Sequence, residues 1–378
     1  MKTAAARLDG LGTTIFTEMT LLAQRTGAIN LGQGFPDDSG PSEAIEAAVA
    51  ALRGGANQYA PLPGVPSLRE AILAHQRDYY GLEPEDLLVT FGATEAIASA
   101  LLGLCDPGDV VITLEPYYDS YAACIAFAGA RRRTVTLRPP DFALDGDAVR
   151  AALEAEVGRA KVLLLNTPHN PTGRVLSREE LTRLADLCVE HDLVCVSDEV
   201  YEHLVYEGEH IPIASLPGMA ERTLTISSIG KSFSFTGWKV GWCSGPADLV
   251  ASVRKVKQFL TFAGGTPLQH AAAAALALPP NHLTALRDLF KANRDRLAEA
   301  IATAGWTPLP SAGTYFINAD VGEDAVAFCA ALPQRRGVVA IPTSAFYDDK
   351  DAGPTLVRFA FCKRTEVIDE AARRLTDV

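Results

Sequence analysis

Short apolar segments that end in polar or glycine-rich clusters recur along the chain, and this pattern constrains the fold more than any other feature. Segments with helical periodicity follow most of them, for example at 96–105 and 178–190. Strands that are apolar throughout and alternate with helices are typical of a largely parallel sheet covered on both faces. The apolar segments lie at residues 86–91, 109–114, 161–165, 193–197 and 223–227.

The polar clusters stand directly after these segments, at the expected carboxyl ends of the strands. In open parallel sheets, ligands bind beyond those ends. We therefore expect five separate parts of the chain to converge on one site. The clusters read GATE at 92–95, EPYY at 115–118, NTPHNPTG at 166–173, DEVY at 198–201 and SIGK at 228–231.

The remainder of the chain is less sheet-like and predicts a second, smaller domain. Because 378 residues exceed one ordinary core, we expect a large α/β domain over 42–280 and a small α+β domain formed by 1–41 and 281–378. In the latter, the sequence predicts helices at 283–304 and 366–375 and strands at 315–319, 338–341 and 356–361.

Composition and charge exclude several classes of function. A formal net charge of −12 argues against a nucleic-acid partner, which requires a basic face. No apolar stretch has the roughly 20 residues that span a membrane, and the amino terminus lacks a signal-peptide core. Seven scattered cysteines without a C-x-x-C pair indicate reduced thiols and a cytoplasmic location. The seven dispersed histidines show no metal-binding spacing, so no metal is expected.

Each polar cluster, taken alone, also fits a purely structural interpretation. GATE can be an ordinary helix start, NTPHNPTG a turn, and Asp198 the partner in a structural salt bridge, because a buried acid is costly unless it meets a cation. The glycines Gly32 and Gly34 do not form a dinucleotide loop, since a third glycine is missing and Pro36 prevents the helix that must follow.

Taken together, the clusters point to one cofactor. The run SSIGKSFSFTGWKVGW at 227–242 places Lys231 and Lys239 among small and aromatic residues, although lysine is rarely buried without a partner. Pyridoxal 5′-phosphate accounts for the whole set, because it carries a phosphate, a protonated ring nitrogen, a phenolate oxygen and an aldehyde that a lysine captures as an imine.

At this point the sequence resembles the class I and II aminotransferases, which have fold type I of the pyridoxal-phosphate enzymes. The resemblance runs along nearly the whole chain, and NPTG, D-E-x-Y and S-x-x-K followed by G-W-K are specific in that order. It implies a large domain with a mostly parallel sheet flanked by helices, plus a smaller α+β domain. The motifs that carry it are LGQGFPD, NQYAPLPG, GATEAI, EPYYDSY, NTPHNPTG, DEVY, SSIGKSFSFTGWKVGW, PSAGTYF and VRFAF.

The resemblance implies roles for the residues that would contact the cofactor ring. Lys231 would form the imine and later move the proton between the substrate Cα and the cofactor. Asp198 would accept a hydrogen bond from the ring nitrogen and keep it protonated. Asn170 and Tyr201 would hydrogen-bond the phenolate oxygen, and the ring of Tyr118 would stack on the cofactor.

It also implies a phosphate site and a substrate site. The phosphate would meet the backbone of Ala93 and Thr94, the hydroxyl of Ser228 and the cation of Lys239, where many relatives carry an arginine. Arg358 would hold the substrate α-carboxylate in a two-pronged hydrogen bond.

Other positions would complete the substrate site and extend it across an interface. Gly34 would contribute its backbone to the substrate site, and Asn170 would support the same carboxylate. Tyr59 matches a tyrosine that reaches the phosphate of the neighbouring subunit, which implies a homodimer with shared active sites.

The implied reaction is a ping-pong transfer of an amino group from an L-amino acid to a 2-oxo acid such as 2-oxoglutarate. The segments FLTFAGGTPLQ and GVVAIPTSAF are similar to enzymes that act on N-succinyl-LL-diaminopimelate in lysine biosynthesis. Such a donor needs a cation for its distal carboxylates, and the candidates are Arg25, Arg53 and Arg131.

The alternative is a broad-specificity glutamine, methionine or kynurenine aminotransferase, although no histidine follows Phe262 as in the kynurenine type. A β-lyase, decarboxylase or cyclase on the same scaffold is a further alternative. A ligand-sensing regulator would need a basic DNA-binding module, which the sequence lacks.

Overall fold

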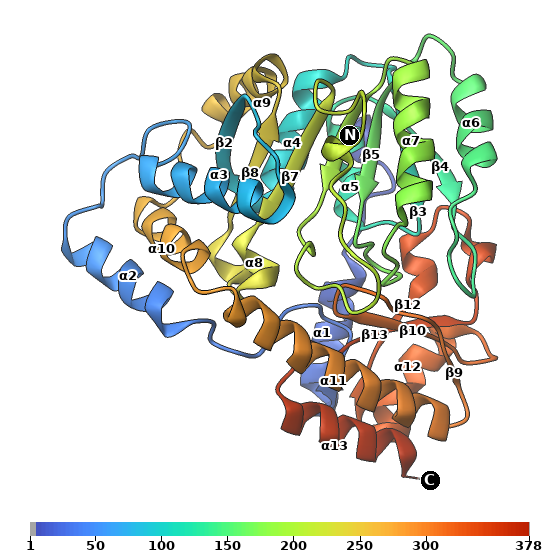
Figure 1. Ribbon diagram of the computed structural model, residues 1–378. Helices are drawn as coiled ribbons and strands as arrows, with labels where there is room; N and C mark the ends of the chain where they lie inside the picture. The colour runs from blue at the N-terminus through green and yellow to red at the C-terminus, as the bar shows by residue number, and fades with distance from the viewer. Residues whose placement is uncertain (1–4, 378) are drawn as a thin grey trace.

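The computed structural model describes residues 5–377, which form a seven-stranded sheet, a four-stranded sheet and a further two-stranded pair (Figure 1). The larger sheet has seven strands. Their order across the sheet is β2 (Asp86–Phe91), β8 (Val240–Gly245), β7 (Thr223–Ser228), β6 (Val194–Asp198), β5 (Ala160–Asn166), β3 (Val110–Glu115) and β4 (Arg131–Thr136).

All neighbouring strands of this sheet are parallel except at β8, which runs antiparallel to both β2 and β7. Because two antiparallel steps restore the direction, β2 points the same way as β7. The carboxyl ends of all five expected strands therefore lie at one edge. The predicted α/β class with a mostly parallel sheet is confirmed.

Two strands of this large sheet, β4 and β8, were not predicted, and each has a physical reason for escaping detection. β4 has the sequence RRRTVT and is an edge strand of the sheet. Its three arginines leave it without the apolar run by which the other strands were recognised. β8 begins inside the lysine- and glycine-containing run at 227–242, and the small residues on both sides of the buried Trp242 interrupt its apolar pattern.

Helices cover both faces of the large sheet because successive strand residues point to opposite sides. Leu163 packs in the core formed with α6 (Gly146–Glu154) and α7 (Arg178–Glu190). Its neighbours Val162 and Leu164 pack in the core formed with α4 (Gly92–Leu104), α5 (Ser120–Phe127) and α9 (Ala247–Leu260). Another cluster joins β2 and β8 to α2 (Ser42–Arg53), α3 (Pro66–Tyr80) and α10 (Thr266–Leu276).

The smaller sheet is antiparallel and lies beneath the larger one in Figure 1. It orders β12 (Ile341–Pro342), β13 (Leu356–Ala360), β10 (Phe316–Asp320) and β9 (Thr307–Pro308). The helices of this part of the chain are α1 (Ile15–Thr26), α11 (Asn281–Thr303), α12 (Ala325–Arg336) and α13 (Thr365–Thr376).

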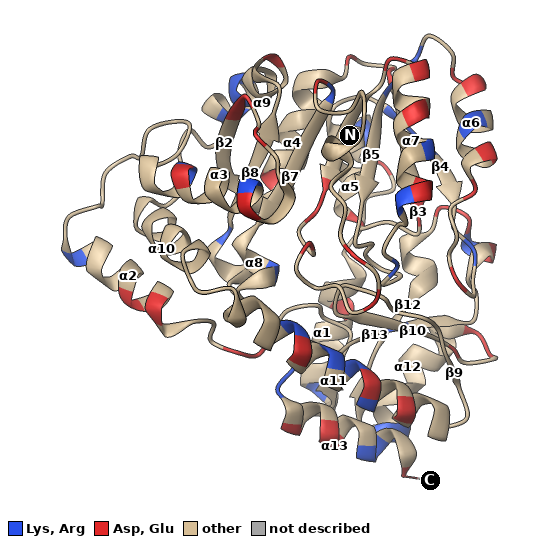
Figure 2. Ribbon diagram, in the orientation of Figure 1, with Lys and Arg blue, Asp and Glu red and all other residues tan. Residues whose placement is uncertain are grey.

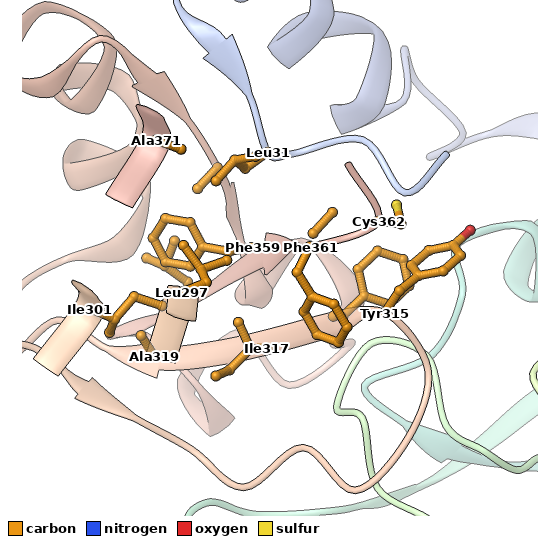
Figure 3. Close-up of a cluster of buried hydrophobic side chains, with 14 of the residues drawn as sticks. Leu31, Leu297, Ile301, Tyr315, Ile317, Ala319, Phe359, Phe361, Cys362 and Ala371 are labelled. Atoms are coloured by element: carbon orange, nitrogen blue, oxygen red, sulfur yellow. The ribbon is translucent and has the colours of Figure 1, made fainter. Parts of the chain in front are cut away.

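The amino-terminal segment joins this second unit. β1 (Ile29–Asn30) pairs in parallel with β11 (Val338–Val339), and Leu31 lies beside Phe359 in the shared core (Figure 3). The exact domain boundaries at 41/42 and 280/281 stay a prediction. Short helices complete the fold: η1 (Ala6–Leu8), η2 (Ile213–Ser215), α8 (Ile229–Ser232), η3 (Thr236–Trp238), η4 (Thr343–Phe346) and η5 (Lys350–Ala352).

Acidic and basic residues are interspersed on the outer helices, including α7, α11 and α13 (Figure 2). No helix within residues 5–377 combines the length and the apolar character needed to cross a membrane. All seven cysteines are buried and free of disulfides.

Candidate active site

One cavity opens at the edge of the large sheet where the carboxyl ends of the parallel strands meet. Residues of the second unit, including Phe316 and Arg358, line its other side. The predicted site residues that line this cavity are Gly34, Ala93, Thr94, Tyr118, Asn170, Asp198, Tyr201, Ser228, Lys231, Lys239 and Arg358. The convergence expected from the polar clusters is therefore present in the fold.

Lys231 lies on α8, the single helical turn that follows β7. Its Nζ donates a hydrogen bond to the Tyr315 hydroxyl at 2.9 Å, and within the described residues it forms no ion pair. Burial lowers the pKa of Lys231 to about 8, since the charged form loses its hydration. The amine can thus lose its proton near neutral pH, as a nucleophile or general base must.

Asp198 ends β6 and is 5% exposed. Its Oδ2 accepts a hydrogen bond from the Tyr121 hydroxyl at 2.6 Å, and its Oδ1 accepts one from the Val200 N–H at 3.4 Å. Burial nevertheless raises the pKa of Asp198 to about 6. No lysine or arginine among residues 5–377 forms an ion pair with it, so the purely structural salt bridge considered from the sequence is absent. The carboxyl group is available to a buried cationic ligand.

Arg358 is fully buried, and its guanidinium lies between the rings of Phe316 and Phe346, with Cζ 3.9 Å and 4.6 Å from their centroids. Nη1 donates to Asn170 Oδ1 at 2.9 Å, and Nη2 donates to the Gly32 carbonyl at 3.2 Å. Nε is buried without a partner. Burial lowers the pKa of Arg358 to about 10, yet the group stays cationic at neutral pH. The carboxylate of a bound substrate can accept a hydrogen bond from this free N–H group of Arg358.

The close approach of the backbone to the rings of Phe316 and Tyr315 requires a glycine at position 34. A Cβ on Gly34 would lie 2.3 Å from the Phe316 ring. The expected substrate-side role of this backbone thus agrees with the space around it.

The first turn of α4 forms a cationic cradle. Its Ala93 and Thr94 N–H groups have no preceding helical carbonyl, and both residues line the cavity beside Gly92, whose φ is +69°. An ideal Cβ placed on Gly92 would lie 3.4 Å from Nζ of Lys239, so the ammonium lies against this helix end. The partly positive amino-terminal end of α4 and the Lys239 ammonium lie together, and this arrangement favours the binding of an anion such as phosphate.

Two further features complete the cradle. The Ser228 hydroxyl lines the cavity and forms no capping bond to α8, so it is free for a ligand. A Cβ on Gly241 would lie 2.6 Å from the Gly92 carbonyl carbon, so only glycine lets β8 pass this close to α4.

The predicted tyrosines differ in their placement. Burial raises the pKa of Tyr118 to about 12 and raises that of Tyr201 further, so both phenols are protonated donors. Tyr59 does not line the cavity of its own chain. Its side chain is 82% exposed, and its ring packs edge-on with Phe262, with 5.4 Å between the two ring centroids.

The arginines suggested for a distal carboxylate also lie outside the cavity. Arg131 pairs with Glu156 at 3.0 Å, and Arg25 bonds the Leu21 carbonyl of its own helix at 3.3 Å. The side chain of Arg53 is exposed at the end of α2. Arg358 is therefore the one arginine among the described residues that lines the cavity.

Sequence reasoning missed two residues that position the central groups, Tyr121 and Tyr315. Both lie inside motifs that were recognised, EPYYDSY and PSAGTYF, so the signal was present as an aromatic residue without an assigned role. Tyr315 is fully buried, and Figure 3 shows its hydroxyl pointing away from the apolar cluster.

These features fit pyridoxal 5′-phosphate. The cradle suits its phosphate, Asp198 suits a protonated ring nitrogen, and the unpaired amine of Lys231 suits its aldehyde. The partnerless Arg358 Nε leaves a donor for the carboxylate of an amino acid.

The chain matches a described family over most of its length. Residues 26–375 match the family model described as aminotransferase class I and II. A Mycobacterium tuberculosis protein named probable N-succinyldiaminopimelate aminotransferase is 50% identical, with 98% of this chain and 97% of that protein covered. Escherichia coli methionine aminotransferase is 42% identical (98% and 97% covered), and Rattus norvegicus kynurenine–oxoglutarate transaminase 3 is 39% identical (97% and 88% covered).

Solved structures agree with the sequence comparison. The structure of the M. tuberculosis N-succinyldiaminopimelate aminotransferase matches with a TM-score of 0.96 and 50% identity, covering 99% of both chains. The E. coli structure, reported with a methionine aminotransferase function, matches with a TM-score of 0.94 and 42% identity, again over 99% of both chains.

Proposed function

Because this chain belongs to the class I and II aminotransferases, pyridoxal-phosphate-dependent enzymes of fold type I, we propose that its reaction takes place in the cavity around Lys231. The observation that carries this proposal is a partly buried lysine amine, without an ion pair among the described residues, in one cavity with a buried aspartate and an anion cradle. When bound, the cofactor supplies an aldehyde that takes up the amino group and a ring that accepts electrons from the substrate Cα.

Lys231 is the proposed proton carrier. Its amine is held at Nζ by Tyr315, and its pKa of about 8 lets it both take up and release a proton near neutral pH. Asp198 is proposed to accept a hydrogen bond from the protonated ring nitrogen; the Tyr121 hydroxyl fixes Oδ2, and Oδ1, which accepts only the 3.4 Å bond from the Val200 N–H, has a lone pair left for the ring.

The remaining contacts orient the reactants. Asn170 and Tyr201 are proposed to bind the phenolic oxygen, and the ring of Tyr118 to cover one side of the cofactor. Arg358, supported by Asn170, is proposed to hold the substrate α-carboxylate. This places the Cα–H bond within the cavity that the lysine amine also lines.

For the phosphate, we propose the first turn of α4 with the Ala93 and Thr94 N–H groups, the Ser228 hydroxyl and the Lys239 ammonium. The lysine ammonium is a compact charge and cannot bind two phosphate oxygens in a fixed plane as an arginine guanidinium does. The backbone N–H donors therefore orient the phosphate.

For the amino donor, we propose N-succinyl-LL-diaminopimelate, with 2-oxoglutarate as acceptor, which would place the enzyme in lysine biosynthesis. The support is the 50% identity over 98% of the chain to the M. tuberculosis protein of that name.

A neutral donor such as methionine, glutamine or kynurenine is the second candidate, because one specific observation favours it. The lining of the cavity includes Phe16, Phe35, Phe316 and Gln33, which suits an apolar or amide side chain. An acidic donor would need a further cation from outside this lining.

We also propose a homodimer in which Tyr59 reaches the phosphate site of the partner. An 82% exposed tyrosine whose ring packs against the exposed Phe262 supports an interface there. A cytoplasmic location is proposed from the seven buried free thiols, which are typical of a reducing compartment.

Two experiments test this function. Lys231→Ala should abolish turnover while the protein still retains cofactor through the other contacts, whereas Lys255→Ala, at an exposed position on α9, should leave both unchanged. Full activity in Lys231→Ala would remove Lys231 from its role.

A donor panel decides the substrate class. With 2-oxoglutarate as acceptor, kcat/KM is measured for N-succinyl-LL-diaminopimelate, methionine, glutamine and kynurenine. A preference for the neutral donors would refute the diaminopimelate proposal. Product formation that does not require the 2-oxo acid would indicate a lyase, decarboxylase or cyclase instead.

A further inference from the structure

A second cluster of chemically active side chains lies outside the cavity, between α3 and the segment that follows β6. His75 Nε2 and His203 Nε2 are 2.6 Å apart, although 128 residues separate them in the sequence. One ligand atom each from His75, Glu202 and His203 lies within 4.8 Å of the others. His75 and Glu202 are buried, and His203 is partly exposed.

The buried carboxylates around this cluster are held by hydroxyl and imidazole groups. Glu202 Oε1 accepts a hydrogen bond from Ser227 at 2.6 Å. Glu199 accepts one from Ser197 at 2.7 Å and lies 2.9 Å from His210 Nε2. Both carboxylates are buried, Glu199 at 1% and Glu202 at 8% exposure, and no lysine or arginine among the described residues forms an ion pair with either. A bound cation would add charge compensation to these two buried carboxylates, which a buried anion requires.

We propose that His75, Glu202 and His203 bind one divalent transition-metal ion, of which Zn²⁺ is the natural probe. Two imidazole nitrogens and one carboxylate oxygen form a ligand set that suits zinc, with a water in the fourth position. The partial exposure of His203 and the 42% exposed Tyr79 beside it provide access for the ion and the water.

The geometry requires a small adjustment on binding. Two ligands at about 2.1 Å from a tetrahedral ion lie roughly 3.4 Å apart, so the imidazoles must separate by somewhat less than an ångström. His203 can move because part of its surface faces solvent. Without an ion, the two rings share one proton in a hydrogen bond, which is the competing explanation that the experiment must separate.

The ion would have a structural role and not a catalytic one. It would join α3 to the carboxyl end of β6, and its carboxylate ligand follows Tyr201 directly. Ser227, which holds that carboxylate, precedes Ser228 of the cavity. The ion would thus stabilise two strand ends that carry site residues. The sequence predicted no metal because the ligands are too far apart to form a recognisable spacing.

Zn²⁺ titration of the chelator-treated holoenzyme tests the proposal. Calorimetry should give one ion per chain, and Co²⁺ should produce visible bands of a four-coordinate site at longer wavelength than the cofactor absorption. His75→Gln and His203→Gln should each weaken Zn²⁺ binding at least about tenfold and abolish the rise in Tm that Zn²⁺ causes in the wild type. His270→Gln, at a histidine outside the cluster, should behave as the wild type.

Absence of stoichiometric Zn²⁺ binding to the wild type would overturn the proposal, as would unchanged binding in both cluster variants. If a variant fails to fold, the Co²⁺ spectrum of the wild type decides: bands of an octahedral hydrated ion alone would contradict a His–His–Glu site. None of these readouts depends on aminotransferase activity.

Discussion

Nζ of Lys231 lies 2.9 Å from the phenolic oxygen of Tyr315, and that hydroxyl in turn donates to the Gly34 carbonyl. The three groups come from α8, from the segment before β10 and from the amino-terminal segment. The position of the amine therefore depends on the second unit of the fold as well as on the sheet edge that carries it.

Tyr315→Phe removes the acceptor of the lysine hydrogen bond without changing the packing of the ring. A hydrogen bond to a charged group contributes about 1.5–3 kcal/mol, so kcat should fall about tenfold or more. The matched control is Tyr347→Phe, which removes a buried hydroxyl bonded to the Leu137 carbonyl outside the cavity. The assigned role is wrong if both variants show the same kcat.

The same substitution should shift the titration of Lys231 in the cofactor-free protein. Loss of an acceptor disfavours the charged amine, so the pKa, already lowered to about 8, should fall further. The pH dependence of labelling at Lys231 by an amine reagent measures this shift, and an unchanged or raised pKa would contradict it.

Asp198→Asn should stabilise the cofactor-free protein while it reduces turnover at least about hundredfold. Burial raises the pKa of Asp198 from 3.8 to about 6, so the folded state binds the extra proton. The wild type therefore loses stability as the pH rises from about 4 to 6, and stays lower above it, by on the order of 3 kcal/mol.

The asparagine side chain that this substitution introduces does not titrate, so the variant should exceed the wild type in stability at pH 7.5 and approach it near pH 4. Urea unfolding at the two pH values measures the difference. A variant that is less stable than the wild type at pH 7.5 would show that the buried carboxylate is compensated by groups other than the cofactor.

Arg358→Lys keeps the charge but replaces the planar fork between Phe316 and Phe346 by a point charge. The KM of the amino donor should rise about tenfold or more, whereas the absorption band of the bound cofactor should not change. Steady-state kinetics and the visible spectrum measure the two effects. Arg335→Lys, at an exposed arginine on α12, should leave KM unchanged.

Gly241→Ala should weaken cofactor binding. Its Cβ would lie 2.6 Å from the Gly92 carbonyl carbon, and this overpacking should separate β8 from the first turn of α4. The dissociation constant of the cofactor, measured on reconstitution of the cofactor-free protein, should rise at least about tenfold. Gly237→Ala is the matched control, because no atom lies within 4 Å of its added Cβ.

Mixing inactive variants tests the shared active site. A dimer of one Lys231→Ala chain and one Tyr59→Ala chain contains one complete site if Tyr59 acts across the interface. Random exchange should then restore about a quarter of wild-type activity. Mixing Lys231→Ala with Asp198→Asn should restore none, because both residues line the cavity of their own chain. No recovery in the first mixture would refute the role of Tyr59.

Particular residues show how far the sequence could predict this site. Lys231, Asp198 and Asn170 each follow an apolar strand, and parallel strand ends meet at one edge, so their convergence followed from local patterns. Tyr121 and Tyr315 could not be assigned in this way. Their hydroxyls meet Asp198 and Lys231 only because separate elements pack together.

The sequence by itself determined the family, the α/β class, the cofactor and eleven of the residues that line the cavity, because these depend on short motifs and on residue types whose chemistry is local. The tertiary structure decided the rest: the antiparallel passage of β8 past α4, the two tyrosines that hold the amine and the acid, and the meeting of His75 with His203. Such contacts join residues far apart in the chain. Their free energy depends on how all the helices and strands pack together, and it cannot be assigned to any single segment.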